Sequence, residues 1–312
     1  MLSTSQTDFI QTIARGEAIH VNAGHMLYRR LIVDHPVKPW FIKAHDSSLF
    51  TVESKRSEAL RYLEKEANVY QHLRDMQFAH IPMSHHFSDG VLLLSGLTEQ
   101  DGWHWKIPSG HNGAKYVVSA LNALEALQSI DTHHMFDTEP SANFFWQEGW
   151  GSDKSMLEAI RSHKHIWSSR LRENSNQSLE RLAMSLTTVQ LSAPLPVTSH
   201  ISHHDIRQSN LAWHPVEGTV LVDWSWASHG VHNADATMLL IDLHKSGVDV
   251  SLWLPTHFNA DYAKLLIGYW LLRVGEPSAQ GNDVVRLQQL VSAISAFELV
   301  TAVTTTIQSR TP

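Results

Sequence analysis

The chain contains no cysteine among its 312 residues, which excludes disulfides, thiolate zinc sites and cysteine nucleophiles. It also lacks long hydrophobic runs. The longest apolar stretches, such as residues 91–94, fall far short of the roughly 20 residues that a membrane helix needs. Residues 1–20 contain no uninterrupted apolar segment of the kind found in secretory signals. We therefore expect a cytoplasmic protein with no membrane partner.

The chain also has no excess of positively charged residues. Charged residues make up 18% of the chain and the formal net charge is −7, so no basic surface indicates a nucleic-acid partner. The chain has 312 residues, 43% of them hydrophobic. This length is too great for one small core and predicts two lobes or domains.

Histidine and tryptophan are abundant, with 22 and 11 residues. Histidine metal sites usually place two ligands at i and i+4 on one helix face. His163 and His165 are only two residues apart, and three pairs are adjacent in the sequence: His85–His86, His133–His134 and His203–His204. We therefore interpret the histidines outside the 203–210 segment as structural or surface residues.

Hydrophobic periodicity predicts a small β-rich part followed by a larger helical part. Residues 27–33 and 40–43 are typical of strands, residues 57–73 of an amphipathic helix, and residues 83–88 and 91–94 of a hairpin around Asp89 and Gly90. Further helices are predicted at 114–130, 156–167, 179–191, 259–274 and 283–307, with a second hairpin at 210–213 and 220–224. This order indicates an α+β fold rather than alternating β-α units.

The strongest motif is the sequence HHDIRQSN at residues 203–210, followed by Asp223 after the apolar run 220–222. Phosphoryl transfer requires a carboxylate that orients the attacking hydroxyl and cations that neutralise the phosphates. Asp205 is suited to the first role. Asn210 and Asp223 offer the hard oxygen ligands that Mg²⁺ prefers.

These residues resemble the aminoglycoside phosphotransferase and choline kinase-like enzymes of the protein-kinase-like superfamily, whose catalytic loop reads H-x-D-x-x-x-x-N. The tryptophan-rich segment after Asp223 resembles a bacterial subgroup with unassigned substrates. The resemblance implies a bilobal kinase-like fold, with a nucleotide-binding lobe at 1–95, a catalytic and acceptor-binding lobe at 96–312, and a hinge at about 93–97. It also implies ATP- or GTP-dependent transfer of the γ-phosphate to a hydroxyl of an amino sugar, sugar, amino alcohol or antibiotic.

The resemblance also implies roles for residues of the catalytic segment. Asp205 would be the base, His203 would brace the loop, and Arg207 would contact the γ-phosphate. Asn210 and Asp223 would hold Mg²⁺. Asp235, twelve residues after Asp223, occupies the place of a family aspartate that braces the same loop.

Nucleotide binding is expected in the first lobe. Lys43 ends a predicted strand at the place of the family lysine that pairs with the α- and β-phosphates. Glu66 is the candidate partner of this lysine, with Glu64 as the second choice. Gly24 lies in the predicted phosphate loop, which has one glycine and no G-x-G-x-x-G. Ser95 and Leu97 lie in the hinge, whose backbone would face the adenine.

Two residues depart from the family pattern: His204 replaces a common glycine, and Gln128 stands where many relatives have histidine. Aromatic residues at 144–150, Trp226, Trp253 and Trp270 are candidates to line the acceptor site. They could cage a quaternary ammonium, stack on sugar rings or fill the core. The single acid in residues 294–312, Glu298, counts against an aminoglycoside acceptor.

Three other classes of protein are alternatives to a small-molecule phosphotransferase. A pseudokinase that binds nucleotide or a partner would not need all of Lys43, Glu66, Asp205, Asn210 and Asp223. A protein kinase would carry D-F-G and A-P-E motifs and an activation segment longer than the interval between Asp223 and Asp235. A hydrolase would carry G-x-S-x-G or H-E-x-x-H, and neither occurs. The acceptor, the choice of ATP or GTP and the oligomeric state stay open.

Overall fold

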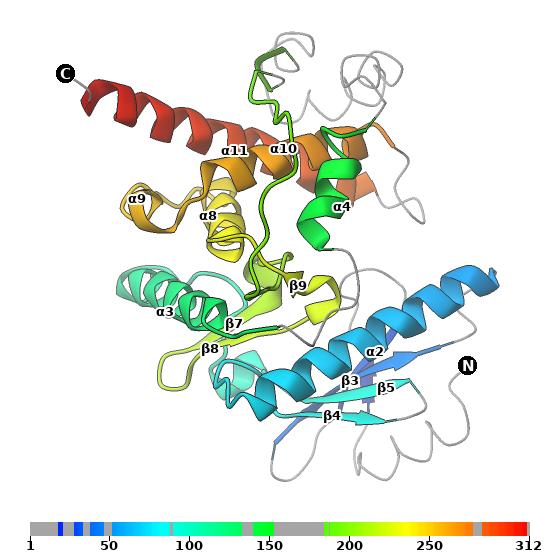
Figure 1. Ribbon diagram of the computed structural model, residues 1–312. Coiled ribbons are helices and arrows are strands. Elements are labelled where there is room, and N and C mark those ends of the chain that lie inside the picture. The colour runs from blue at the N-terminus through cyan, green and yellow to red at the C-terminus, as the bar shows by residue number, and fades with distance from the viewer. Residues whose placement is uncertain are drawn as a thin grey trace. The chain divides into compact units, whose positions relative to one another are not determined.

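A computed structural model describes residues 18–20, 28–33, 38–46, 52–87, 90–132, 140–152, 184–186, 188–276 and 283–310. Its packing divides the chain into two compact units (Figure 1). The first unit comprises Met1–Ala126 and Gln208–Ala227, and the second comprises Leu127–Arg207 and Ser228–Pro312. This division by packing differs from the lobe boundary near residue 95, which stays a prediction.

The first unit contains a five-stranded antiparallel sheet in the order β1-β2-β3-β5-β4. Its strands are β1 (Ala18–His20), β2 (Tyr28–Val33), β3 (Trp40–His45), β4 (Ser84–Phe87) and β5 (Val91–Ser95). Branched and aliphatic side chains from the three central strands, such as Val33, Ile42 and Leu93, form its buried core. The helix α2 (Glu53–Asp75) contacts β3, β4 and β5 and lies across one face of the sheet (Figure 1).

The same unit contains α3 (His111–Gln128), whose last two residues belong to the second unit, and the hairpin of β7 (Leu211–His214) and β8 (Gly218–Leu221). Short 3₁₀ turns η2 (Glu99–Asp101), η3 (Gln208–Asn210) and η4 (Trp224–Trp226) complete it. The hairpin pairs Leu211 with Leu221, and its tight turn places Gly218 at a φ of 83°. The register fixes which residues follow the two strand ends.

The second unit is mainly helical. It contains α4 (Ser141–Gln147), α8 (Ala234–Lys245), α9 (Leu254–His257), α10 (Ala260–Val274) and α11 (Asp283–Arg310), with a small sheet of β6 (Ile201–Ser202) and β9 (Ser228–His229). The helix α10 packs against α4, α8 and α11. Its N-cap Asn259 accepts a hydrogen bond from the Tyr262 amide at 3.0 Å.

Most predicted elements are confirmed within a few residues, but some are not. The second strand of the 210–224 hairpin ends at Leu221, and Trp224 begins η4 instead. Helices α4 and α8 were not predicted, because α4 is short and the N-cap of α8, Asn233, makes no side-chain capping bond. The helix predicted at 156–167 lies outside the described residues, and within 179–191 only 184–186 are described as helical.

The helix α11 qualifies the sequence-based view of membrane segments. Among the described residues, Val284–Thr305 is long and apolar enough to cross a membrane by length and composition. However, Leu290, Ala293 and Ala296 are buried, and α11 packs against α8 and α10. The Ser295 hydroxyl also donates to the Ile241 carbonyl of α8 at 3.2 Å. The helix α11 therefore packs against its neighbours over part of its surface, with 33% of this stretch buried.

Candidate functional site

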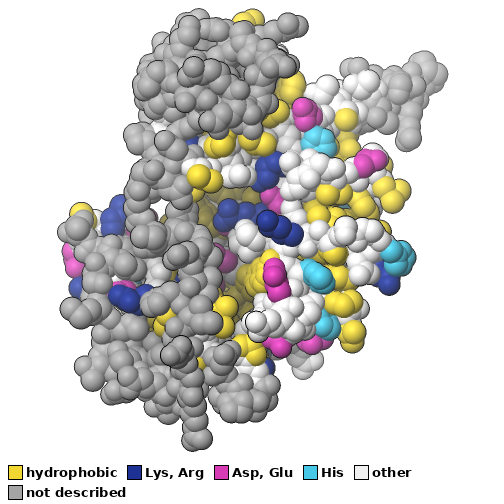
Figure 2. Space-filling model, turned by 180° about the vertical axis from the view of Figure 1, so that it is seen from behind, with side chains coloured by type: hydrophobic (Ala, Val, Ile, Leu, Met, Phe, Trp, Pro, Cys, Tyr) yellow, Lys and Arg dark blue, Asp and Glu magenta, His cyan; other side chains and the backbone are white. Residues whose placement is uncertain are grey.

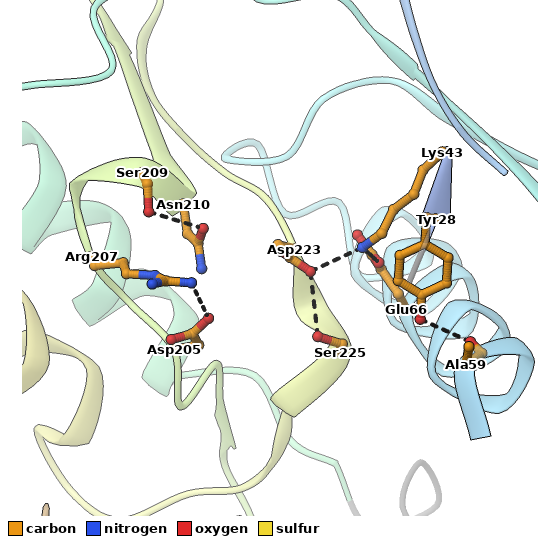
Figure 3. A network of polar contacts seen from close by, with 10 residues as sticks. All are labelled: Tyr28, Lys43, Ala59, Glu66, Asp205, Arg207, Ser209, Asn210, Asp223 and Ser225. Carbon is orange, nitrogen blue, oxygen red and sulfur yellow. Dashed lines mark hydrogen bonds and ion pairs between the residues drawn. The ribbon is translucent and has the colours of Figure 1, made fainter. Parts of the chain in front are cut away.

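Lys43 of β3 is the centre of a buried charge cluster in the first unit (Figure 3). Its Nζ lies 2.6 Å from Oε2 of Glu66, on α2, and 3.0 Å from Oδ1 of Asp223. The Lys43 and Glu66 side chains are only 4% and 1% exposed, whereas that of Asp223 is 34% exposed. The structure therefore joins three of the predicted site residues, and Glu66 rather than Glu64 is the partner of Lys43.

The surroundings of Lys43 favour its charged form. Burial by itself lowers the pKa of Lys43, but the Asp223 and Glu66 carboxylates outweigh this effect and raise it. Burial raises the pKa of the Glu66 carboxyl, and the Lys43 ammonium opposes that shift. The Tyr28 ring of β2 lies 4.7 Å from Nζ of Lys43, and its hydroxyl donates to the Ala59 carbonyl at 2.8 Å. Tyr28 thus adds a cation–π contact that the sequence pattern did not indicate.

The hairpin places Asn210 and Asp223 at the same end of β7 and β8. The Val222 amide donates to the Asn210 carbonyl at 3.1 Å, which extends the ladder by one step. Asp223 has a φ of 69°, and the Ser225 hydroxyl donates to its Oδ1 at 3.3 Å. Asn210 is buried, with its side-chain oxygen accepting from the Ser209 hydroxyl at 3.4 Å (Figure 3).

The donor set at this end of the hairpin is one carboxylate and one amide. Within the described parts of the chain, no group of three or more His, Cys, Asp or Glu side chains could hold a metal. On the side of the molecule that Figure 2 shows, the described histidines form separate small patches. His133, His134, His163 and His165 lie outside the described residues. An oxygen pair of this kind fits Mg²⁺, which uses one or two carboxylates together with phosphate oxygens.

Residues 203–207 of the predicted catalytic loop lie in the second unit, directly after β6. Asp235, in the first turn of α8, accepts hydrogen bonds from the amides of His203 and His204, both at 2.8 Å. Nδ1 of the fully buried His203 accepts from the Asp205 amide at 3.3 Å. Asp235 therefore braces this loop, and the geometry of His203 fits the bracing role expected for it.

Asp205 and Arg207 form an ion pair in the same unit, with Nη2 of Arg207 3.2 Å from Oδ2 of Asp205. Their side chains are 26% and 48% exposed, so both groups reach solvent. Lys43, Glu66, Asn210 and Asp223 belong to the first unit, whereas His203, Asp205 and Arg207 belong to the second. Each group is described within its own unit.

The predicted hinge is already partly hydrogen-bonded. The Ser95 amide donates to the Met83 carbonyl at 2.9 Å, and the Gly96 amide donates to the Pro39 carbonyl at 2.8 Å. The carbonyl of Leu97 accepts from Nε1 of Trp105 at 2.9 Å. These bonds hold the segment in place and occupy several of its backbone groups. Gly24, the phosphate-loop candidate, lies outside the described residues.

The aromatic candidates for the acceptor site lie in different surroundings and do not form one group. In the second unit, Phe145 of α4 lies 4.7 Å from the Tyr269 ring of α10, and Phe144 lies 6.2 Å from the same ring. Trp150 is instead a core residue, because it is buried and its Nε1 donates to the Lys264 carbonyl at 2.7 Å. Trp226 belongs to the first unit, where its ring lies 6.3 Å from that of Tyr62.

Tyr269 was missed by sequence reasoning, although it stands seven residues after Tyr262 on one face of a predicted helix. Burial raises the pKa of the Tyr269 hydroxyl; Arg273 opposes this shift and Asp205 adds to it. The negative charge of Asp205 therefore acts on this hydroxyl. The ring also carries the Arg273 guanidinium 5.5 Å from its centre.

A family model described as "Phosphotransferase enzyme family" matches residues 38–272. No curated protein matches the chain. Choline kinase LicA from Streptococcus pneumoniae is 12% identical, with 95% of this chain and 99% of that chain covered and a TM-score of 0.53.

Two further solved structures have the same fold. A thermostable mutant of aminoglycoside phosphotransferase APH(4)-Ia, in complex with ADP and hygromycin B, is 12% identical, covers 95% of this chain and 99% of its own, and gives a TM-score of 0.55. A choline/ethanolamine kinase family protein from Mesorhizobium loti is 10% identical, covers 95% and 98%, and gives 0.50. At these identities the likeness concerns the fold, and it confirms the predicted α+β protein-kinase-like class.

Proposed function

Because the chain belongs to the phosphotransferase enzyme family, as the match over residues 38–272 shows, we propose that it transfers the γ-phosphate of ATP or GTP to a hydroxyl group of a small molecule. The predicted family and enzyme class, a small-molecule phosphotransferase, are confirmed. The donor, the metal, the acceptor and the residue roles are the proposal.

The buried cluster of Lys43, Glu66 and Asp223 carries this proposal. A lysine held at 2.6 Å by a buried glutamate has a fixed position and a permanent charge, which is what binding of the α- and β-phosphates requires. A purely structural ion pair would gain little, because desolvation of two charges offsets most of their attraction. The third member, Asp223, is partly exposed and can therefore reach a ligand.

In the proposed transfer, Asp205 orients the acceptor hydroxyl and takes its proton. The hydroxyl oxygen forms a bond to the γ-phosphorus while the bond to the bridging oxygen breaks, and the nucleoside diphosphate leaves. His203 and Asp235 hold the loop that carries Asp205. Arg207, now paired with the Asp205 carboxylate, provides a cation for the γ-phosphate.

Asn210 and Asp223 would hold Mg²⁺, which when bound neutralises negative charge on the phosphates. Their fit rests on the oxygen donors at one end of the β7–β8 hairpin. Lys43 and Ser225 orient the Asp223 carboxylate there. We further propose that Gly24, Ser95 and Leu97 contact the nucleotide, as the family resemblance implies.

For the acceptor we propose an amino sugar, sugar, amino alcohol or antibiotic that contacts Phe144, Phe145 and Tyr269. One solved structure of this fold contains ADP and hygromycin B, and another is a choline kinase. We propose a cytoplasmic location, with a nucleoside triphosphate and the acceptor as partners and without nucleic acid or membrane.

The test is Mg²⁺-dependent ADP release from ATP across a panel of aminoglycosides, choline, ethanolamine, hexoses, amino sugars and nucleosides. Asp205→Ala serves as the blank. The control is Asp261→Ala, an aspartate that is 60% exposed on α10 and pairs with Lys264. Turnover of about 1 per second or more with one acceptor, lost in Asp205→Ala and kept in the control, would support the proposal.

The same assay separates the enzyme from a pseudokinase. An Asp205→Ala variant with wild-type turnover would show that the proposed base is wrong. Nucleotide binding without transfer to any acceptor favours the pseudokinase, which acts as a nucleotide- or partner-binding module. Absence of nucleotide binding in a separate binding measurement contradicts the proposed enzyme, because the Lys43 cluster would then have no ligand.

A further inference from the structure

We propose that His204 is a positioning residue, which fastens the loop carrying Asp205 to helix α10 through the hydroxyl of Tyr262. This inference rests on the proposed function, since Asp205 is the base there. His204 has a φ of 60° in the left-handed region, which glycine adopts at little cost and other residues rarely adopt. A residue that keeps a side chain at this position needs a compensating interaction.

The His204 ring provides that interaction. The residue is only 1% exposed, and both ring nitrogens are hydrogen-bonded within the second unit. Nδ1 lies 2.8 Å from the Tyr262 hydroxyl of α10, and Nε2 lies 3.2 Å from the carbonyl oxygen of His229 in β9. The ring therefore connects the loop to a helix and to a strand.

The hydrogen-bond roles follow from the partners. A carbonyl oxygen can only accept, so Nε2 of His204 carries the proton. With the ring neutral, Nδ1 accepts from the Tyr262 hydroxyl, which also lies 3.8 Å from Sδ of Met238. Burial chiefly raises the pKa of Tyr262, with Asp235 and Asp205 adding to the shift, so the phenol keeps its proton. This arrangement satisfies both nitrogens without burying a charge.

Tyr262 is itself held in place. It is fully buried, and its amide donates to the N-cap side chain of α10, Asn259. The ring of Phe145 meets the His204 ring edge to face, with centroids 6.1 Å apart. Phe145 also packs against Tyr269, and both residues are proposed to contact the acceptor. The His204 ring therefore joins the loop that carries Asp205 to the residues proposed to contact the acceptor.

Two independent fastenings then act on the peptide before Asp205. Asp235 holds the His203 and His204 amides, and the His204 side chain holds α10 and β9. Loss of the Tyr262 bond leaves the Asp235 bonds intact, so the loop should stay folded but less closely held. Because a misplaced base lowers turnover rather than nucleotide binding, we expect kcat to fall while KM for ATP stays unchanged.

The experiment uses the full chain with Tyr262→Phe, His204→Asn, His204→Gly and the double variant His204→Gly/Tyr262→Phe. Tyr262→Phe removes one oxygen, and asparagine tolerates positive φ but is too short for both bonds. Each single variant should lower kcat by roughly 3- to 10-fold, which corresponds to one net hydrogen bond. The kcat of the double variant should be no lower than that of the worse single variant, because both substitutions remove the hydrogen bond between His204 and Tyr262.

Two controls accompany these variants. Tyr116→Phe removes a phenol oxygen from a fully buried tyrosine of α3. Gln77→Gly relieves positive φ, here 57°, outside the loop. Both should keep kcat within twofold of the parent chain. Unchanged kcat in Tyr262→Phe, or additive losses in the double variant, would overturn the inference.

A measurement without turnover separates this inference from the proposed function. Amide hydrogen exchange at residues 203–205 should become faster in Tyr262→Phe and His204→Gly, even if no acceptor is found, and should stay unchanged in Tyr116→Phe. Unchanged exchange at these amides contradicts the role of His204 whatever the activity. Faster exchange combined with a parent chain that never transfers phosphate contradicts the proposed function alone.

Discussion

At the scale of single residues, Lys43 carries a positive charge at a place that solvent does not reach. Two carboxylates and an aromatic ring replace its water shell. Such a group is costly when one partner is removed, but much less so when both members of a pair are replaced by residues of similar size. Stability and activity can therefore be separated by substitution.

We predict that Lys43→Met lowers the free energy of unfolding by about 3 kcal/mol, because Glu66 is left buried and unpaired. The double variant Lys43→Met/Glu66→Leu should recover most of this loss yet remain at least about 100-fold less active, because the Lys43 cation for the α- and β-phosphates is lost. Urea denaturation and steady-state kinetics measure the two effects. If the double variant regained activity, Lys43 would be only structural.

Lys65 of α2 gives a prediction for pH. Burial chiefly lowers the pKa of this lysine to about 8, and the nearby Arg61 adds to the shift. The folded chain therefore releases the Lys65 proton at lower pH than the unfolded chain, whose lysines have a pKa near 10.4. Stability should rise with pH between about 8 and 10.4 on account of this group, and below pH 8 the buried charge should cost stability.

Lys65→Met should therefore raise the free energy of unfolding at pH 7 by about 1 kcal/mol and remove this rise above pH 8. Denaturation in urea at several pH values from 6.5 to 10 checks it. Lys55→Met is the control, because Lys55 is 66% exposed and pairs with Glu58 at the surface. A parallel pH dependence of both variants would contradict the prediction.

At the scale of elements, α4 and its following turn pack very closely against α10. A Cβ added at Gly268 would lie 2.4 Å from Nε1 of Trp150, and one added at Gly149 would lie 2.7 Å from the amide nitrogen of Tyr269. Glycine is required at both positions because the neighbouring groups leave no room for a side chain. This contact fixes the positions of Phe145 and Tyr269 relative to one another within the second unit.

We predict that Gly268→Ala lowers the free energy of unfolding by about 1–3 kcal/mol, the usual cost of an overpacked core. The smaller ring in Gly268→Ala/Trp150→Phe should recover part of this loss. Thermal unfolding of Gly268→Ala, Trp150→Phe and the double variant measures the energetic coupling between residues 268 and 150. If Gly268→Ala were as stable as the parent, the close α4–α10 contact would not exist in solution.

At the scale of the whole molecule, nucleotide binding should stabilise the folded chain by mass action. At a ligand concentration 100 times the Kd, the gain is about 2.7 kcal/mol. We predict that Mg·ATP raises the unfolding temperature, that ATP with EDTA raises it less, and that Asp223→Ala removes this difference. Asp249→Ala is the control, because its carboxylate is exposed and accepts from Ser251 nearby in the sequence. An equal shift with and without Mg²⁺ in the parent chain would contradict the metal role of Asp223.

Much of the fold could be predicted from local pattern. Apolar residues at helical spacing in 57–73 predicted α2, and the apolar runs on both sides of Asp89 and Gly90 predicted the β4–β5 pair. The motif at 203–210 with Asp223 predicted the family, because the spacing of chemical groups along the chain is itself part of the sequence. Helices α4 and α8 were missed: α4 is short, and the Asn233 side chain before α8 bonds to Thr256 instead of capping the helix.

The sequence by itself determined the fold class, the order of most strands and helices, and the residue types available for phosphoryl transfer. Tertiary structure alone decided that Glu66 rather than Glu64 meets Lys43, and that Tyr28 lies beside the same ammonium. It also decided that His204 bonds to Tyr262, 58 residues later in the chain. The physical reason is that local spacing sets which face a side chain takes, whereas its partner depends on packing between elements distant in sequence.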